Sequence, residues 1–247
     1  LTFNQTRKAF NDPRLREALS LAFDRESINN DVLRFGEKSA YAFVPPGTAN
    51  YPGTARLKFA NMPQAARIER ARKLMAEMGY GPTKHFRTSY ETTQDPDNVR
   101  VAAALQQMWR KIYVDVDIVK IDLPIHYKNL QVQQFDIASA AWIADFNDAS
   151  NFLDLLRSDS GNNYGKYKNP KFDALMAAAQ QEPDAAKRGA LMAQAEQIAL
   201  DENALLPWRF RKTQDLVQPY VRGWIPNARN FNRTRWLWID HTIKPER

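Results

Sequence analysis

The sequence predicts an α/β or mixed α+β fold, and three observations lead to it. Helix-like and strand-like patterns alternate along the 247 residues. Clear turn signals, such as Pro45-Pro46-Gly47 and Pro52-Gly53, separate these patterns. Hydrophobic residues make up 44% of the chain and charged residues 26%, a balance that allows a buried core.

The first elements are two helices near the start of the chain. Asn11-Asp12-Pro13 combines a capping side chain with a proline that fits the first helical turn. Apolar residues then recur at helical spacing through Phe23, which predicts one buried face. A second, short helix is expected from about Asp24 and carries Ile28, Val32 and Leu33.

The middle of the chain continues the alternation of helices and strands. We expect helices over residues 63–78, 98–112 and 125–131, and Gly79 ends the first of them. We expect strands over residues 85–90, 114–118 and 135–142, the last of them buried on both faces because its residues are small. Three more helices are expected over residues 148–156, 170–181 and 184–200.

The last forty or so residues contain scattered aromatic and basic side chains without a long helical pattern. The whole chain has a net charge of +7 and a pI of about 9.5, as in proteins that bind nucleic acids or anionic surfaces. Its densest basic stretches, residues 209–212 and 229–235, are short and match no nucleic-acid-binding signature. We therefore favour a basic soluble protein without a nucleic-acid partner.

Several kinds of chemistry find no support in the sequence. There is no cysteine, so disulfides and thiolate ligands are excluded. His85, His126 and His241 are isolated, which argues against a histidine-based metal site. Neither a GxSxG elbow, a Walker A loop nor a GxGxxG turn is present. We predict no enzyme, no catalytic residue, no metal and no cofactor.

One enzymatic alternative rests on Asp115 and Asp117, which share one face of a predicted strand. A pair of carboxylates could serve a retaining glycosidase. The solvent-facing side of any half-buried strand shows the same pattern, and we favour that interpretation.

No apolar run approaches the roughly 20 residues that a membrane-spanning helix needs. The chain opens at Leu1 without an initiator methionine, so we expect that an upstream segment has been removed or omitted.

The segment 142–153 is the strongest candidate for a site. An apolar strand runs into Asp145 and then into a helix start, and α/β proteins place ligands at such strand ends. A carboxylate flanked by Trp142 and Phe146 suits a cation such as a peptide ammonium group. Alternatively, Asp145 and Asp148 only cap the turn and the following helix. The residues alone leave these two interpretations open.

Four ordered segments of the chain closely resemble the periplasmic oligopeptide-binding proteins, the family 5 extracellular solute-binding proteins of ABC importers. The first runs from Phe10 to Arg25 and the second from Ala71 to Tyr80. The third is Trp142 to Asn147, similar to the "W-AD(Y/F)(N/D)" motif of the family, and the fourth is Asn162 to Leu175. Because the motifs keep their order over nearly the full length, the resemblance is specific.

The resemblance implies a periplasmic-binding-protein-like clamshell, of which this chain is the C-terminal part. Residues 1–213 would form the C-terminal ligand-binding lobe, and residues 214–247 would return to the N-terminal lobe. Away from that lobe, we expect four aromatic side chains to be candidates for exposed apolar surface: Trp224, Phe231, Trp236 and Trp238.

The resemblance also implies site residues. The aspartate of the motif pairs with the α-ammonium group of the peptide, and Asp145 is the matching position. Trp142 and Ile143 would line the cleft, and we include Phe146 and Asn147 in the predicted ligand-binding set. Some family members meet the peptide carboxylate with a basic residue and a histidine, but this chain has Ser139 and Asn98 at those positions.

The implied function is an extracytoplasmic receptor that delivers short peptides to an ABC importer. It would be a monomer in the periplasm, or lipid-anchored outside the cell, and its partners would be a small peptide and the membrane permease. Two alternatives remain open. One is the solute-sensing domain of a transcription regulator, and the other is a receptor for a non-peptide ligand such as nickel, haem or a sugar.

Overall fold

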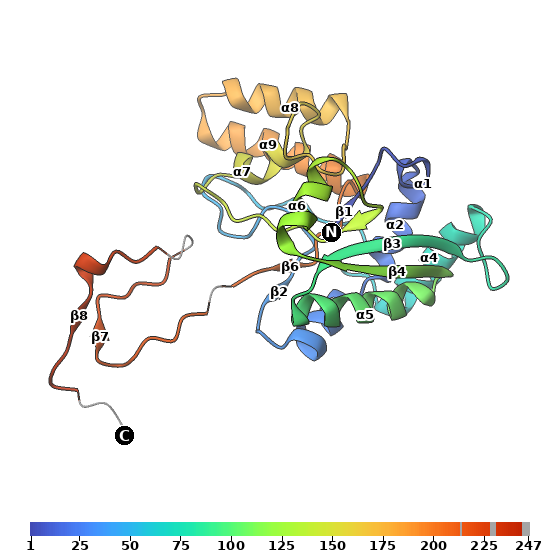
Figure 1. Cartoon of the computed structure of the whole chain (residues 1–247). Helices are drawn as coiled ribbons and strands as arrows, with labels where there is room; N and C mark the ends of the chain where they lie inside the picture. The colour runs from blue at the N-terminus through green and yellow to red at the C-terminus, as the bar shows by residue number, and fades with distance from the viewer. Residues whose placement is uncertain (213, 228–230, 244–247) are drawn as a thin grey trace.

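The computed structural model describes residues 1–212, 214–227 and 231–243. Its centre is a four-stranded sheet with the strand order β1-β5-β3-β4 (Figure 1). The two long strands, β3 (Phe86–Thr93) and β4 (Val114–Ile121), are parallel over their whole length. The short strand β5 (Ile137–Ala138) is parallel to β3, and β1 (Thr2–Phe3) is antiparallel to β5. The carboxyl ends of β3, β4 and β5 therefore point to the same edge of the sheet.

Helices cover both faces of this sheet. Helix α5 (Pro96–Arg110) connects β3 to β4 and lies on one face, whereas α6 (Leu123–Gln131) lies on the other (Figure 1). Leu105 and Trp109 of α5 are fully buried, and the Trp109 indole donates a 2.9 Å hydrogen bond to the carbonyl oxygen of Leu19. This bond ties α5 to α2 (Pro13–Ala22), which packs in turn on α4 (Gln64–Glu77).

A second core lies beside the sheet and belongs to the helical hairpin of α8 (Pro170–Gln181) and α9 (Ala185–Asp201). The carboxylate of Glu196 on α9 is buried and accepts hydrogen bonds from the backbone N–H groups of Phe43 and Val44, at 2.5 and 2.9 Å, and from the Tyr51 hydroxyl. Burial raises the pKa of Glu196. One side chain thus attaches the loop between residues 40 and 52 to the hairpin.

Most of the predicted elements are confirmed. Asp12 caps α2 by accepting from the Arg14 N–H group, and Gly79 ends α4 with a φ of +83°. The short helix expected near Asp24 is α3 (Arg25–Ser27), which continues as a π-helix over Ile28–Leu33. The remaining helical elements are α1 (Lys8–Asn11), α7 (Ser150–Leu153) and the 3-10 turn at Asp154–Leu156.

The strand expected over residues 135–142 is wrong in its extent. Only Ile137 and Ala138 pair with neighbouring strands, and Ala140 and Ala141 are exposed rather than buried on both faces. The chain leaves the sheet at Ser139, whose carbonyl oxygen lies against the ring of His126 instead of a neighbouring strand. Small residues are compatible with a buried strand, but they do not by themselves keep a segment in a sheet.

The C-terminal segment leaves the main body after β6 (Arg209–Phe210), which pairs with β2 (Lys38–Ser39). It contains the short pair β7 (Val221–Arg222) and β8 (Trp238–Ile239), and a 3-10 turn at Thr234–Trp236. Figure 1 shows this segment standing apart from the body.

Three of the four aromatic residues that we expected to be exposed are so, namely Phe231, Trp236 and Trp238, whereas Trp224 is partly buried. Parts of the predicted segment 214–247 and of the basic stretch 229–235 fall on residues 228–230 and 244–247, outside the described residues.

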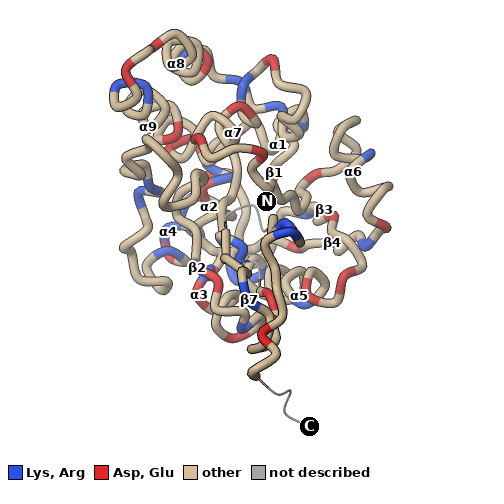
Figure 2. The backbone as a smooth tube through the Cα atoms, turned by 90° about the vertical axis from the view of Figure 1, so that its left-hand side faces the viewer, with Lys and Arg blue, Asp and Glu red and all other residues tan. Residues whose placement is uncertain are grey.

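Charges of both signs are distributed over the helices of the body (Figure 2). On α4, for example, Arg70 donates to Glu17 of α2 at 2.9 Å, and on α5 Arg100 donates to Asp97 at 2.5 Å. None of the helices that the structure describes is both long and apolar enough to cross a bilayer.

Candidate ligand-binding site

The predicted site lies at the carboxyl edge of the sheet. Strand β3 ends at Thr93, β4 ends at Ile121, and the chain leaves β5 at Ser139 to form the loop that we call the ligand loop, residues 139–149. In open α/β sheets, ligands bind beyond this edge because the connecting loops there form a crevice. The structure therefore brings the ligand loop next to the ends of the two long strands.

Asn151, at the start of α7, holds the ligand loop together. Its Oδ1 accepts a 2.7 Å hydrogen bond from the indole Nε1 of Trp142 and a 3.4 Å bond from the backbone N–H of Asp145. Asn151 is buried, whereas the loop that it holds is partly exposed. This clasp sets the orientation of Trp142 and the backbone at Asp145.

Asp148 has a structural role. It caps α7 by accepting from the N–H and hydroxyl groups of Ser150, at 2.9 and 2.7 Å. Both of its oxygens also accept from Arg188 on α9, at 2.5 and 2.8 Å. These contacts, above all the bond from Arg188, lower the pKa of Asp148 to about 2. The cap that the sequence left open between two residues thus belongs to Asp148.

Asp145 differs from Asp148 in every one of these respects. Its side chain is exposed, and among the described residues none donates a hydrogen bond to its carboxylate or forms an ion pair with it. Its neighbours Ile143 and Phe146 are exposed to 79% and 53%, although both are large and apolar. A free carboxylate between apolar side chains is suited to an organic cation, because the carboxylate neutralises the charge and the apolar groups contact the carbon skeleton.

Asn147 faces a different neighbour. Its Oδ1 accepts a 3.0 Å hydrogen bond from the backbone N–H of Ala49, in the loop that Glu196 attaches to α9. Asn147 therefore braces the ligand loop against the second core. This contact is structural in the present arrangement, whereas Trp142, Ile143, Asp145 and Phe146 keep surface that a ligand could contact.

A buried polar cluster under the ligand loop was not predicted from the sequence. His126 on α6 lies 2.8 Å from a carboxylate oxygen of Glu91 on β3 and 2.8 Å from the carbonyl oxygen of Ser139. Asn129 donates to the second oxygen of Glu91 at 2.8 Å. His126 and Asn129 are three positions apart on one helical face, the only sequence signal that could have suggested the cluster. The partner, Glu91, is remote in sequence.

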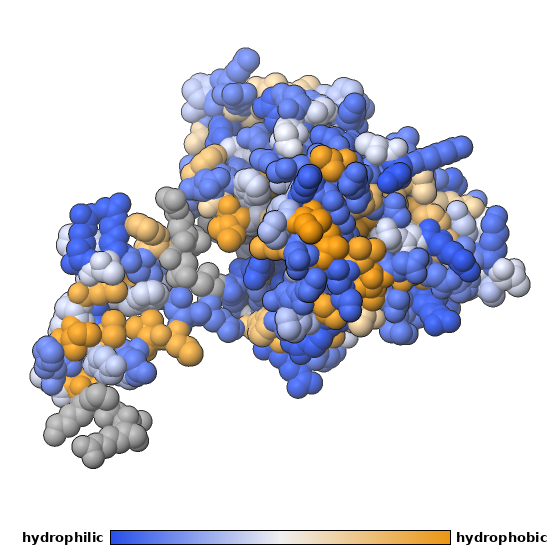
Figure 3. All heavy atoms as spheres, in the orientation of Figure 1, coloured by the Kyte–Doolittle hydropathy of each residue, from blue (hydrophilic) through white to orange (hydrophobic). Residues whose placement is uncertain are grey.

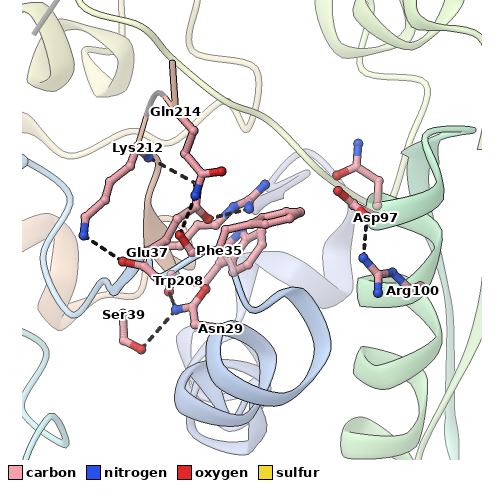
Figure 4. Close-up of polar contacts among 12 residues, drawn as sticks. Asn29, Phe35, Glu37, Ser39, Asp97, Arg100, Trp208, Lys212 and Gln214 are labelled. Carbon is pink, nitrogen blue, oxygen red and sulfur yellow. Dashed lines mark hydrogen bonds and ion pairs between the residues drawn. The ribbon is translucent and has the colours of Figure 1, made fainter. Parts of the chain in front are cut away.

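A hollow of about 560 Å³ opens beside the ends of β3 and β4. Polar contacts connect residues of its lining. Arg209 donates to Glu37 at 2.5 Å and Lys212 donates to the carbonyl oxygen of Gly36 at 2.7 Å. The Gln214 side chain donates to the carbonyl oxygen of Phe35 at 3.0 Å, and Figure 4 shows Lys212, Gln214, Phe35 and Glu37 gathered together. Asn98 and Asp122 lie in its lining, as do Arg211 and Lys212. The hollow thus offers cations as well as carboxylates near the carboxyl edge.

A family model, bacterial extracellular solute-binding proteins, family 5 Middle, matches residues 1–164. The chain belongs to this family. It is 34% identical over 225 residues to the periplasmic oligopeptide-binding protein OppA of Escherichia coli K12. This match covers 90% of this chain and 41% of OppA. It is also 31% identical over 239 residues to the probable deoxycholate-binding periplasmic protein YgiS of E. coli, covering 96% of this chain and 44% of YgiS.

The fold is that of the periplasmic peptide-binding proteins. The solved structure of the E. coli murein tripeptide binding protein MppA superposes with a TM-score of 0.89 at 29% identity, over 96% of this chain and 47% of MppA. The chain therefore spans less than half the length of the relatives that it matches.

Several residues of the family motifs have structural roles in this member of the family. Arg16 donates to the carbonyl oxygens of Glu202 and Asn203 at the end of α9, and Asn169 caps α8 through the N–H groups of Lys171 and Phe172. Asn163 donates to the carbonyl oxygen of Tyr167 at 2.7 Å and accepts from its N–H group. These three residues of the first and fourth motifs therefore stabilise the fold.

Asn98 and Ser139, the positions at which the resemblance implied partners for a peptide carboxylate, both contact strand β3. The Asn98 side chain donates to the hydroxyl of Thr93 at 2.8 Å, and the Ser139 hydroxyl lies 3.4 Å from that of Thr92. Both are neutral and engaged with β3. Among the described residues, the cationic side chains in the lining of the hollow are Arg209, which pairs with Glu37, Arg211 and Lys212.

Proposed function

We propose that the protein is an extracytoplasmic receptor that binds short peptides and delivers them to an ABC importer. The observation that carries this proposal is the free carboxylate of Asp145, at the carboxyl edge of the sheet and between apolar side chains. It would bind the α-ammonium group of the peptide. The names of the relatives OppA and MppA, an oligopeptide-binding and a murein tripeptide binding protein, support a peptide ligand.

The apolar surface around the site supports closure of a second lobe over the ligand. Leu123 and Ile125 of α6 are exposed, as is Val132 directly after it, and Figure 3 shows apolar side chains gathering over α6 and β4. Another apolar group lies on the C-terminal segment (Figure 3), where Ile225, Phe231 and Ile239 are exposed. We propose that residues 1–213 form one lobe of the receptor and that residues 214–247 pack on the other lobe.

Peptide binding can be tested by calorimetry on the full-length protein. Trialanine with a free N-terminus should bind, and N-acetylated trialanine should bind at least about tenfold more weakly, because an amide cannot replace the ammonium group. Asp145→Asn should weaken binding of free trialanine by about 10–100-fold without changing the unfolding midpoint. Glu69→Gln, which removes an exposed carboxylate on α4, is the matched control. Equal affinity for both peptides would refute recognition of the amine by Asp145.

A second candidate is a receptor for a non-peptide ligand, and the relative named as a probable deoxycholate-binding protein favours it. Deoxycholate carries a carboxylate and no amine, so Asp145 would repel it. Arg211 and Lys212 would then be the charged contacts. Binding of deoxycholate in the absence of trialanine binding, weakened by Arg211→Gln and unchanged or improved by Asp145→Asn, would select this candidate.

We also propose that the receptor acts as a monomer in the periplasm, or anchored by a lipid outside the cell, without a nucleic-acid partner. It would have no catalytic activity, because it releases the bound peptide intact to the permease. Recovery of unchanged trialanine after prolonged incubation with the full-length protein tests the last point. Cell fractionation and light scattering test the location and the oligomeric state.

A further inference from the structure

The His126 ring is buried between two elements and the start of the ligand loop. The side chains of His126 and Glu91 are only 3% and 5% exposed, so water does not compete for their hydrogen bonds. Nδ1 of the ring is 2.8 Å from Glu91 Oε1, and Nε2 is 2.8 Å from the carbonyl oxygen of Ser139. The ring therefore bridges α6, β3 and the first residue of the ligand loop.

The two partners of the ring determine how many protons the pair holds. A carbonyl oxygen only accepts hydrogen bonds, so Nε2 must carry a hydrogen to bond with Ser139. A second hydrogen must lie between Nδ1 and the Glu91 carboxylate, whichever of the two atoms carries it. The observed arrangement therefore needs two protons on the His126–Glu91 pair, one more than a neutral ring with an ionised carboxylate.

When the His126–Glu91 pair loses this proton, Nε2 of His126 has another hydrogen-bond partner within reach. The Ser139 hydroxyl oxygen lies 3.4 Å from the same Nε2. When Nε2 carries no hydrogen, the Ser139 carbonyl oxygen faces a lone pair and is repelled, whereas the hydroxyl can rotate and donate to Nε2. The shorter distance to the carbonyl oxygen, 2.8 Å, assigns the doubly protonated pair to the observed arrangement. The ring thus holds the loop backbone in one protonation state only.

None of the other described groups around His126 and Glu91 supplies the charge or the hydrogen that this proton provides. On α6, Asn129 donates to Glu91, and the ring of Tyr127 lies edge-on at 5.7 Å from that of His126. On β3, burial raises the pKa of Tyr90 to about 12, so it remains neutral. On the loop, the Ser139 hydroxyl also contacts that of Thr92. Among the described residues, Glu91 is the only charged group within ion-pair distance of His126.

We propose that His126 is a positioning residue whose shared proton with Glu91 locks the start of the ligand loop, so that ligand affinity falls as this proton is lost with rising pH. This inference rests on the proposed function, because Trp142 and Asp145 follow Ser139 in the same loop. The protonated arrangement holds the loop ready for the ligand, and a disengaged carbonyl lets the loop sample other conformations. By linkage, a bound ligand makes the pair retain its proton more strongly.

The first test is the pH profile of trialanine binding to the full-length protein. Measurements between about pH 5 and about pH 7 keep the ligand amine protonated, since its own titration lies near 7.7–8.0. For the native protein we expect affinity to fall as the pH rises, and a flat native profile would overturn the proposal. His126→Gln should bind more weakly at about pH 5 and show a flat profile. His85→Gln, which alters the partly exposed ring near Asp115, should keep the native profile.

Two further variants separate positioning from folding. Replacing both partners with apolar residues, His126→Phe with Glu91→Leu, keeps the buried volume filled and should fold. It should bind with a flat profile, because no proton remains to be lost. Glu91→Gln alone should also flatten the profile. A native-like pH dependence in either variant, or in His126→Gln, would overturn the proposal.

A readout without ligand distinguishes failure of this inference from failure of the proposed function. The ¹H–¹⁵N signal of the Trp142 indole reports on the ligand loop, and the ring signals of His126 report its protonation. In the native protein we expect the Trp142 signal to change with pH in parallel with the His126 signals, and in His126→Gln we expect it not to respond. If trialanine does not bind but the signals titrate together, the peptide function fails and the positioning role stands. A Trp142 signal that does not follow His126 overturns the positioning role itself.

Discussion

The indole Nε1 of Trp142 donates a 2.7 Å hydrogen bond to Oδ1 of Asn151, nine residues further along the chain. The same oxygen accepts from the backbone N–H of Asp145 at 3.4 Å. One buried amide thus connects two residues of the predicted site, and it does so from α7, outside the ligand loop. The site depends on a residue that would not itself contact a ligand.

Replacing Asn151 should therefore loosen the site. Asn151→Ala removes the acceptor of both bonds and should lower the free energy of unfolding by about 1–2 kcal/mol. It should also weaken trialanine binding, because Trp142 is no longer oriented. Denaturant unfolding and calorimetry measure the two effects. Asn61→Ala, at an exposed position before α4, is the control. Equal stability of the two variants would show that the hydrogen bonds to Asn151 do not stabilise the protein.

The ion pair of Asp148 and Arg188 makes stability depend on pH in the acid range. The pKa of Asp148 falls from 3.8 to about 2 in the folded protein, so its contribution is present above pH 3.8 and is lost as the pH falls to about 2. Asp148→Asn should cost about 1–2 kcal/mol at neutral pH, and this cost should shrink as the pH falls from 3.8 through about 2. Thermal unfolding across this range measures the difference.

Asp159→Asn provides the comparison for Asp148, because Asp159 also pairs with an arginine, Arg157, but is largely exposed. It should leave stability unchanged within error, since water screens exposed ion pairs. Similar losses for the two variants would show that burial of Asp148 does not matter.

The guanidinium group of Arg25 is fully buried and has carbonyl oxygens for partners instead of a carboxylate. It donates to Ala40 and Pro207 at 3.0 and 2.8 Å and to Ser20 at 3.0 Å. Burial lowers the pKa of Arg25 to about 9, so it remains charged at neutral pH. Arg25→Met should cost about 3–5 kcal/mol, because these carbonyl groups lose their donor. Denaturant unfolding measures the loss.

Arg110→Met is the control for Arg25, since Arg110 is exposed at the end of α5. We expect a change within about 0.5 kcal/mol for this variant. An equally small change for Arg25→Met would mean that the buried guanidinium group is not required for the fold.

Gly189 lies inside α9, where alanine would ordinarily be preferred by about 1 kcal/mol. A Cβ atom at this position would overlap the carbonyl oxygen of Asn50 in the adjacent loop. Gly189→Ala should therefore destabilise the protein by about 1–3 kcal/mol, the opposite sign to helix propensity. Gly161→Ala, where a Cβ atom meets no neighbour, should be neutral by the same unfolding measurement. A gain in stability for Gly189→Ala would contradict the close packing of Gly189 against the carbonyl oxygen of Asn50.

The elements with strong local signals were predictable one by one. Asp12 and Pro13 determine the start of α2 through capping and a fixed φ, and Gly79 determines the end of α4 because it adopts a positive φ. The strand over residues 135–142 failed for the opposite reason. Small residues carry little preference of their own, and the carbonyl oxygen of Ser139 faces His126 instead of a neighbouring strand.

The candidate site was predictable only in part. The sequence identified the segment of Asp145 and Asp148, but their roles differ because Arg188, forty residues away, pairs with Asp148 alone. Nothing local to Asp145 distinguishes the two carboxylates. The role of Asn151 was also not predictable, since an asparagine at a helix start has the same local pattern whether it caps the helix or clasps a distant indole.

The sequence by itself determined the α/β class, the positions of most helices, the family and the segment that holds the candidate site. These features follow from periodicity, capping residues and ordered motifs, which act over a few neighbouring positions. Only the tertiary structure decided that Asp145 is free, that Asp148 is paired, and that His126 meets Glu91 beneath the ligand loop. These partners are far apart along the chain and meet only because the sheet and helices pack together. Patterns over a few neighbouring positions do not specify such contacts.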